Sequence, residues 1–206
     1  LVAAGGLCLL TALAFGIPAV AWIRRTREKQ QADRRIRFLA HHDGLTELAN
    51  RASLMEQLEV ELAAVVEHGG SLAVHFIDID RFKEVNDALG HDGGDFLLKS
   101  IAHRLRSAVR TDDIIARMGG DEFVVVQRAI DGPNDAEEFA ARLIKALEEP
   151  LAFRENEIIA TVSIGVAIAP RDGTSPERVL KSADLALYRS KADGRNCVRF
   201  FTADLD

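Results

Sequence analysis

The sequence has only two cysteines among its 206 residues, and this scarcity limits the chemistry of the chain. Cys8 lies in an apolar run and Cys197 in a predicted strand, with no CxxC or Cys/His spacing near either. The chain therefore lacks the pattern of a zinc site and the cysteine pairs of a disulfide framework, which fits a reducing compartment. It also has no internal repeat and no low-complexity tract. The length allows one ordinary domain plus an appendage.

A basic surface is missing from most of the chain as well. The formal net charge is −6, although residues 24–37 contain seven Arg or Lys and two acidic residues. Subtracting this local surplus of five from −6 leaves −11 for the rest of the chain. Such an acidic domain lacks the footprint that nucleic acids require, so we expect no nucleic-acid partner. Small anionic nucleotides, held by a few cations and a metal ion, remain possible.

The first 23 residues contain no charged side chain. As a helix they would reach roughly 34 Å, enough to cross a bilayer core, and Arg24 and Arg25 follow directly. The positive-inside tendency then predicts a transmembrane helix over 1–23, with the rest of the chain in the cytoplasm. A secretory signal peptide is the alternative reading. Residues 24–41 form a charged linker or stalk helix in this interpretation, and the main domain covers 42–206.

The main domain alternates predicted helices and strands, which indicates an α/β fold with helices packed on a mixed central sheet. Helices are expected at 53–66, 96–109, 135–147 and 176–191, and strands at 72–79, 114–118, 123–127, 158–168 and 197–201. Residues 119–122 read as the turn of a hairpin, because glycines permit positive φ. If this hairpin neighbours the first strand, as short connections favour, the turn lies beside that strand's carboxyl end.

Carboxylates gather at that predicted point. Asp78 and Asp80 alternate around Ile79 at the end of the first strand, and Asp121 and Glu122 occupy the turn. The strand end alone could be capped by solvated acids. However, oxygen ligands clustered without His or Cys suit Mg²⁺ or Mn²⁺, and two such ions assist phosphoryl transfer.

The residues around these acids carry a longer resemblance. The turn reads Arg-Met-Gly-Gly-Asp-Glu-Phe over 117–123, and 76–95 contain the pattern FxDIDxFKxxNDxxGHxxGD. An opening DxLTxLxNR segment at 43–51, Ser-Ile-Gly at 163–165 and the run at 183–196 complete the set. In this order, over about residues 38–201, the sequence resembles the GGDEF domain family, the diguanylate cyclases.

The resemblance implies a palm-like nucleotidyl cyclase fold and a set of roles. Asp78, the carbonyl of Ile79, Asp121 and Glu122 would hold two Mg²⁺ or Mn²⁺ ions per active half-site, and Asp121 or Glu122 would act as the base. Asn86 and Asp95 would read guanine, and Asp95 argues against a cyclase with another base preference. The implied substrate-binding residues together are Phe82, Lys83, Asn86, His91, Asp95, Lys191 and Arg195.

The resemblance also implies partners. Each domain would hold one GTP, and a homodimer would join two GTP into cyclic di-GMP with release of two pyrophosphates. Arg110 and Asp113 resemble the RxxD site at which cyclic di-GMP inhibits family members, although a bare RxxD more often marks a polar helix end. The alternative function is a catalytically silent module that binds GTP or cyclic di-GMP. The segment 200–202, followed by acidic residues, resembles the lead-in to an EAL domain, so either module could belong to a GGDEF-EAL protein.

Overall fold

The chain divides into two units, Leu1–Ala40 and His41–Asp206. The structure is a computed structural model that describes residues 17–203, and α2 (Ile17–His41) begins at the first of these. Within this described range, no helix has the length and apolar character needed to cross a membrane. Most of the predicted transmembrane segment, residues 1–16, lies outside the described residues.

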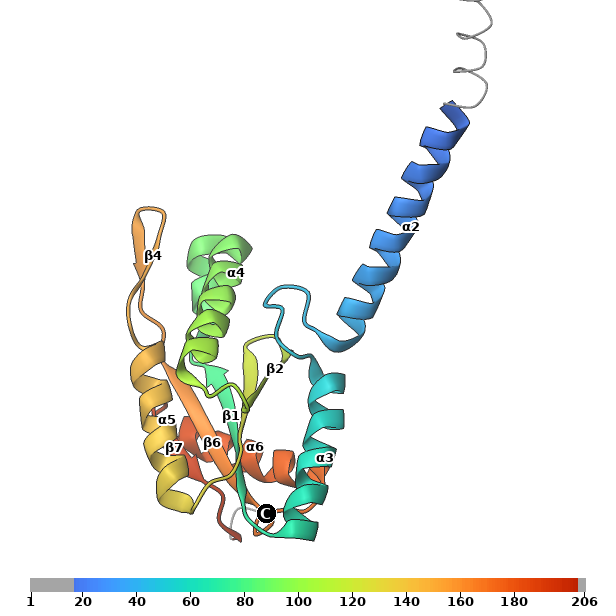
Figure 1. The fold of residues 1–206 in the computed structure, drawn as a ribbon. Helices are drawn as coiled ribbons and strands as arrows, with labels where there is room; N and C mark the ends of the chain where they lie inside the picture. Colours follow the sequence, from blue (N-terminus) through green and yellow to red (C-terminus); the bar gives the residue numbers. More distant parts are fainter. Residues whose placement is uncertain (1–16, 204–206) are drawn as a thin grey trace, which may run out of the picture. The chain divides into compact units, whose positions relative to one another are not determined.

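The second unit is built on a five-stranded mixed sheet in the order β2-β3-β1-β6-β7 (Figure 1). Strand β1 is central and pairs antiparallel with β3 on one side and β6 on the other, whereas β7 runs parallel to β6. The strands are β1 (Leu72–Ile79), β2 (Ile114–Gly119), β3 (Glu122–Gln127), β6 (Val162–Ala169) and β7 (Val198–Phe200). The predicted α/β class with a mixed sheet is confirmed.

Helices cover both faces of the sheet. Successive side chains of β1 point to opposite faces, so each helix layer packs against every second residue of the strand. Ile77 and Ile79 face the helices α4 (Phe82–Ala108) and α5 (Pro133–Leu147) in one apolar cluster. Val74 and Phe76 face α3 (Arg51–His68) and α6 (Pro176–Ala192) in the other. Strand β1 is buried along its whole length. Its last residues therefore lie at the end of the central strand, between these two helix layers.

Helix α4 starts earlier than predicted and is interrupted. The sequence pattern indicated a helix only from residue 96, whereas α4 begins at Phe82 and breaks at Gly90, whose φ of 73° and ψ of 175° are not helical. After this break the chain passes close to the preceding turn. A Cβ at Gly94 would lie 2.1 Å from Asn86 Oδ1, so a larger residue there would displace the Asn86 amide. The kink thus packs two parts of one motif against each other.

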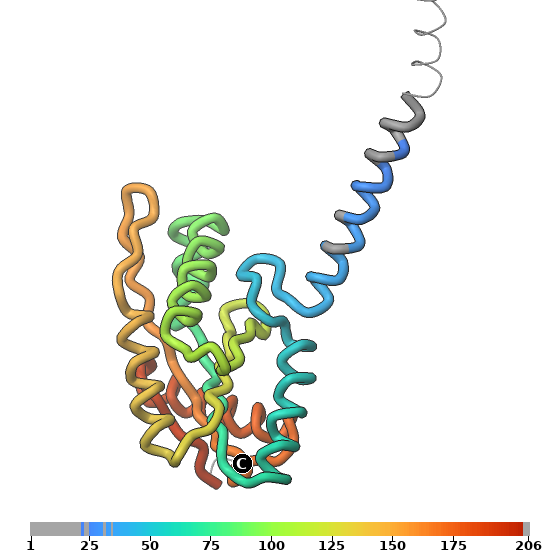
Figure 2. The backbone as a smooth tube through the Cα atoms, in the orientation of Figure 1, coloured from blue at the N-terminus to red at the C-terminus, as the bar shows by residue number. Residues whose placement is uncertain are grey.

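A second hairpin, β4 (Leu151–Phe153) and β5 (Asn156–Ile158), was not predicted. It projects beside α4 in Figures 1 and 2. Phe153 stacks on Phe96 with ring centroids 5.1 Å apart, and Arg154 pairs with Asp92 at 3.1 Å. The prediction of one strand over 158–168 was wrong, because residues 159–161 leave the hairpin before β6 begins at Val162.

Candidate active site

The site starts from one cross-strand pair of acids. Asp78, the next-to-last residue of β1, lies opposite Glu122, the first residue of β3, in the antiparallel register. Directly opposed residues have neighbouring side chains on the same face, so the two carboxylates are close. Lys191, in the last turn of α6, places Nζ 2.7 Å from Asp78 Oδ2. The predicted meeting of strand end and hairpin turn is therefore present in the structure.

Burial and the mutual repulsion of the Asp78, Asp121 and Glu122 carboxylates raise the pKa values of Asp78 and Glu122. Burial raises the pKa of Asp78 above its usual value, Asp121 raises it further, and the ion pair with Lys191 opposes the rise. Burial also raises the pKa of Glu122, and the charges of Asp78, Asp184 and Asp121 add to the effect. Neighbouring carboxylates with raised pKa values gain from a cation, so the cluster is suited to bind one.

The turn between β2 and β3 depends on two glycines. Gly119 and Gly120 have φ of 139° and 53°, values that side chains other than glycine adopt poorly. The backbone amide of Ile79 donates to the carbonyl of Asp121 at 3.3 Å. Arg117 donates to the carbonyl of Gly120. The turn that carries Asp121 and Glu122 is thus attached both to β1 and to its own hairpin.

The predicted guanine-reading residues lie on either side of the kink in α4. Phe82 packs against the core, and the amide of Asn86 lies against Gly94, directly before the exposed Asp95. Lys83 and His91 are exposed on the same stretch of α4. The structure therefore brings Asn86 next to the backbone that carries Asp95, whereas a straight helix would separate positions 86 and 95 by about 13 Å.

Asp80 has a structural role that the sequence did not indicate. Its Oδ1 accepts a hydrogen bond from Ser163 Oγ at 2.7 Å. Its Oδ2 accepts from Thr161 Oγ1 at 2.8 Å and from the backbone amide of Asn196 at 3.1 Å. Asp80 lies near enough to Asp78 for its charge to act on it, as the sequence suggested, but these donors occupy both of its oxygens. Asp80 instead fixes the turn that carries Arg195.

Two other residues were missed as members of the site. Asp184 on α6 acts on Glu122 through its charge, and Arg117 holds the Gly119–Glu122 turn by donating to the carbonyl of Gly120. Both lie inside motifs that the sequence displays, Ala183-Asp184 and the Arg that opens the turn motif. Their motif membership was the available signal, whereas their contacts depend on tertiary structure.

Arg110 and Asp113 lie at the far end of the same hairpin. Strand β2 starts just after Asp113 and runs six residues to Gly119, a span of roughly 17 Å. The amide of Arg110 donates to Asp113 Oδ2 at 2.9 Å, and the amide of Arg128 donates to Oδ1 at 3.1 Å. Asp113 borders an open cavity of about 470 Å³ beside α3. The structure thus keeps this pair apart from the carboxylate cluster.

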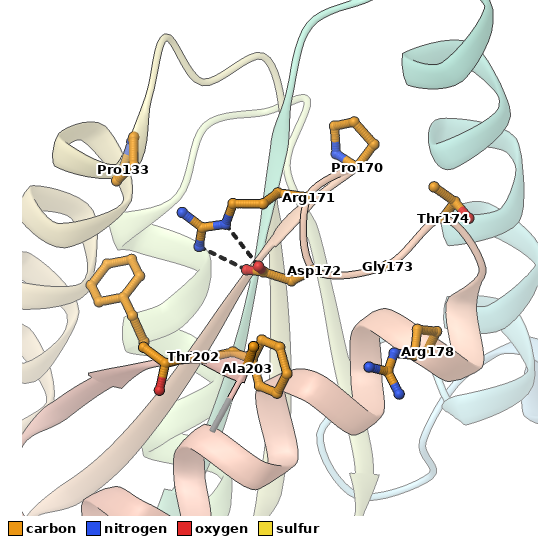
Figure 3. A pocket seen from close by; sticks show the side chains of 11 residues that line it. Pro133, Pro170, Arg171, Asp172, Gly173, Thr174, Arg178, Thr202 and Ala203 are labelled. Carbon is orange, nitrogen blue, oxygen red and sulfur yellow. Dashed lines mark hydrogen bonds and ion pairs between the residues drawn. The ribbon is translucent and has the colours of Figure 1, made fainter. Parts of the chain in front are cut away.

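The cavity of about 770 Å³ shown in Figure 3 is not lined by Asp78, Asp121 or Glu122. Arg171, Asp172 and Phe201 line it, next to the end of β6 that pairs with the start of β1. Both carboxylate oxygens of Asp172 are engaged by the Arg171 guanidinium (Figure 3). The cavity therefore lies apart from the carboxylates, since Asp78 and Glu122 face each other at the opposite end of β1.

The oxygen donors at this end of β1 are of the kind that bind a hard divalent cation. Their side chains are not arranged around one common point. Asp78, Asp121 and Glu122 supply carboxylate oxygens, and the carbonyl of Ile79 is nearby in the chain. Among residues 17–203, no three Asp, Glu, His or Cys side chains form a ready metal cluster. The chemistry of the donors and their mutual repulsion nevertheless match what Mg²⁺ or Mn²⁺ requires.

A palm-like α/β domain with acids at the end of its central strand and in an adjoining Gly-Gly turn defines the class of this protein. The family model "Diguanylate cyclase, GGDEF domain" matches residues 40–197, and the chain belongs to this family.

Relatives with known names agree with this assignment. The bifunctional diguanylate cyclase/cyclic di-GMP phosphodiesterase MucR of Pseudomonas aeruginosa is 41% identical over 176 residues, covering 85% of this chain and 26% of MucR. The GGDEF domain of TpbB from the same organism superposes with a TM-score of 0.78 at 38% identity, covering 80% of this chain and 96% of that one. The coiled coil and GGDEF domain of DgcB from Caulobacter crescentus, solved with c-di-GMP, gives a TM-score of 0.74 at 29% identity, covering 92% and 99%. The chain spans about a quarter of the length of the curated relatives it matches.

Proposed function

We propose that this chain is an active diguanylate cyclase module that condenses two GTP into cyclic di-GMP and two pyrophosphates. The observation that carries the proposal is the opposed pair Asp78 and Glu122, held at the sheet edge with Lys191. An undamaged Gly-Gly-Asp-Glu-Phe turn supports it, since a module that only binds nucleotide has no need of this acidic arrangement.

The reaction is a substitution at phosphorus. The 3′-oxygen of one GTP forms a bond to the α-phosphorus of the other, the bond to pyrophosphate breaks, and the hydroxyl proton passes to a carboxylate. Asp121 or Glu122 accepts this proton. The raised pKa of Glu122 brings its carboxylate nearer to the pH at which a general base works best. The same step in the other direction closes the ring.

Asp78, Asp121, Glu122 and the carbonyl of Ile79 would hold two Mg²⁺ or Mn²⁺ ions per half-site. When bound, the ions stabilise negative charge on the transferred phosphate and the leaving group. Lys191 changes partner in this proposal, since its ammonium is paired with Asp78 at 2.7 Å and can turn to the triphosphate.

Substrate recognition is assigned to α4 and to the end of α6. Asn86 and Asp95 would bind the guanine edge across the kink, with Phe82 and His91 beside them. Lys83, on the first turn of α4, would counter phosphate charge together with Lys191 and Arg195. All seven residues named in this paragraph are half-exposed or exposed, which leaves them accessible to a ligand.

Catalysis requires a homodimer in this proposal, because one domain binds only one of the two nucleotides. Residues 1–23 would anchor the protein in the inner membrane, residues 24–41 would form the stalk, and 42–206 would form the cyclase domain on the cytoplasmic side. Cyclic di-GMP bound at Arg110 and Asp113 would inhibit the enzyme by holding two half-sites apart.

The test is incubation of the dimerised chain with GTP and Mg²⁺, followed by chromatography and mass analysis of the product. We expect cyclic di-GMP and pyrophosphate in a 1:2 ratio, and no product from Glu122→Gln. A protein that binds GTP or cyclic di-GMP without turnover would overturn the proposal in favour of the silent regulatory module.

A further inference from the structure

The Arg117 guanidinium makes three hydrogen bonds at the turn between β2 and β3. Its Nε and Nη2 donate to the carbonyl of Gly120 at 3.0 and 2.6 Å, and its Nη1 donates to Asp43 Oδ1 at 2.9 Å. The side chain is only 10% exposed. One guanidinium therefore joins the turn of the hairpin to a residue 74 positions earlier in the chain.

Asp43 is fixed in turn by its own loop. Its Oδ1 accepts hydrogen bonds from the amides of Leu45 and Thr46, at 3.2 and 2.8 Å, and from Thr46 Oγ1 at 2.7 Å. These bonds leave little freedom for the carboxylate. It presents a rigid acceptor to Arg117.

The backbone strengthens the same connection. The amide of Arg117 donates to the carbonyl of Ala49 at 2.9 Å, and Ala49 forms a parallel bridge with Ala116. The amide of Asn50 donates to the carbonyl of His41, the last residue of α2, at 3.0 Å. The segment 41–50 thus closes on itself and on β2, directly after the helix that enters the domain.

The turn needs such support from outside. Glycine has the largest conformational freedom of any residue type, and the turn contains two glycines, Gly119 and Gly120. The pairing of β2 with β3 also shifts register between Arg117 and Gly119. The bond from Ile79 to the carbonyl of Asp121 is long, at 3.3 Å. The Arg117 guanidinium supplies the shorter contact, one peptide before Asp121.

We infer that Arg117 is a positioning residue that holds the Gly119–Glu122 turn in its catalytic geometry only while it is anchored to Asp43. The segment that follows α2 then sets the geometry of the turn, without touching substrate. This inference rests on the proposed cyclase function for its kinetic effect, but its structural effect on the turn does not depend on turnover. An arginine is required at this position, because its planar guanidinium donates from separate nitrogens to the carbonyl of Gly120 and to the carboxylate of Asp43. The ammonium of lysine has one nitrogen and lacks this geometry.

The experiment compares Arg117→Lys and Asp43→Asn with wild type in the full dimerised chain. The matched control is Arg104→Lys on α4, since the Arg104 guanidinium likewise holds a loop in place, by donating to the carbonyls of Leu147, Glu149 and Pro150. Three quantities are measured: kcat and KM for GTP with Mg²⁺, hydrogen exchange of the amides in 119–123, and the unfolding temperature.

For Arg117→Lys we expect kcat to fall by about 10- to 100-fold, with KM for GTP within about threefold of wild type. Amide exchange in 119–123 should accelerate by at least about tenfold. Asp43→Asn should change kcat and exchange in the same directions by smaller factors. Arg104→Lys should lower the unfolding temperature at most, and leave both kcat and the turn's exchange unchanged.

Unchanged exchange in 119–123 for both site variants would overturn the inference, and so would an equal loss of kcat in Arg104→Lys. If Arg117→Lys does not fold, Asp43→Asn decides by the same criteria. If wild type forms no cyclic di-GMP, the proposed function fails, and the exchange data alone decide whether Arg117 and Asp43 fix the turn.

Discussion

A buried histidine should make the stability of this protein depend on pH. His75 lies in the middle of β1 and is completely inaccessible to solvent, with its ring edge against Phe139 at a centroid distance of 4.9 Å. Its Nε2 is 3.2 Å from Gln127 Oε1, while within the described part of the chain its Nδ1 has no hydrogen-bond partner. Protonation would place a positive charge on that unpartnered atom among apolar side chains. Burial therefore lowers the pKa of His75 from 6.5 to about 4, although the bond with Gln127 opposes the shift.

The sign and size follow from this pKa. Between pH 6.5 and 4 the unfolded chain binds a proton at His75 that the folded chain does not, so the free energy of unfolding falls as the pH falls. The interval is about 2.5 pH units at about 1.4 kcal/mol each, which gives a loss of about 3 kcal/mol. This is a large part of the 5–15 kcal/mol that stabilises a typical domain.

Urea denaturation followed by circular dichroism at several pH values between 7.5 and 5 measures the effect. We expect wild type to lose about 2 kcal/mol between pH 6.5 and 5 relative to His75→Gln, which keeps a polar side chain but cannot titrate. His103→Gln, at an exposed position of α4, is the matched control and should retain the slope of wild type. Parallel curves for wild type and His75→Gln would refute the reasoning.

Three further changes test the site. Asp78→Asn should keep the fold but reduce turnover by several powers of ten, and more than a tenth of the wild-type rate at saturating Mg²⁺ would contradict a ligand role. Asp95→Ser should lower the preference for GTP over ATP by about one to two decades, measured by competition; an unchanged preference would mean that guanine is read elsewhere. Arg110→Ala should leave the initial rate near wild type but relieve inhibition by added cyclic di-GMP in progress curves, whereas equal inhibition of both proteins would make Arg110 a helix-end cation only.

Local patterns predicted the parts of the fold that local chemistry controls. The buried strand at 72–79 and the hairpin around Gly119 and Gly120 follow from apolar runs and turn glycines, and both are present. Their adjacency followed from the preference for neighbouring strands, and the register of Asp78 with Glu122 agrees with it. The chemical roles of these residues remain predictions.

Features that depend on distant partners could not be read in this way. The break of α4 lies at Gly90, and Asn86 and Gly94 pack together across it, whereas the apolar periodicity indicated a helix only from residue 96. The short β4–β5 hairpin has three residues in each strand, too few for a periodic signal. Asp80 appeared equivalent to Asp78, because both sequence positions end the same strand. Its hydrogen-bond donors come from residues 161–196, which sequence spacing does not connect to it.

The bonds of Asp80 have a practical consequence for anyone who needs an inactive reference protein. Replacing Asp80 would release Ser163, Thr161 and the amide of Asn196 at once, so the strand and the turn before β7 would lose their common anchor. In such a variant, a loss of activity could come either from a missing catalytic group or from a smaller amount of folded protein. In the part of the chain that the structure describes, Asp78 is paired with the flexible side chain of Lys191, and its replacement breaks none of the backbone bonds that Asp80 makes. Of two acids separated by one residue, only the first is therefore suited to a clean knock-out in the cell.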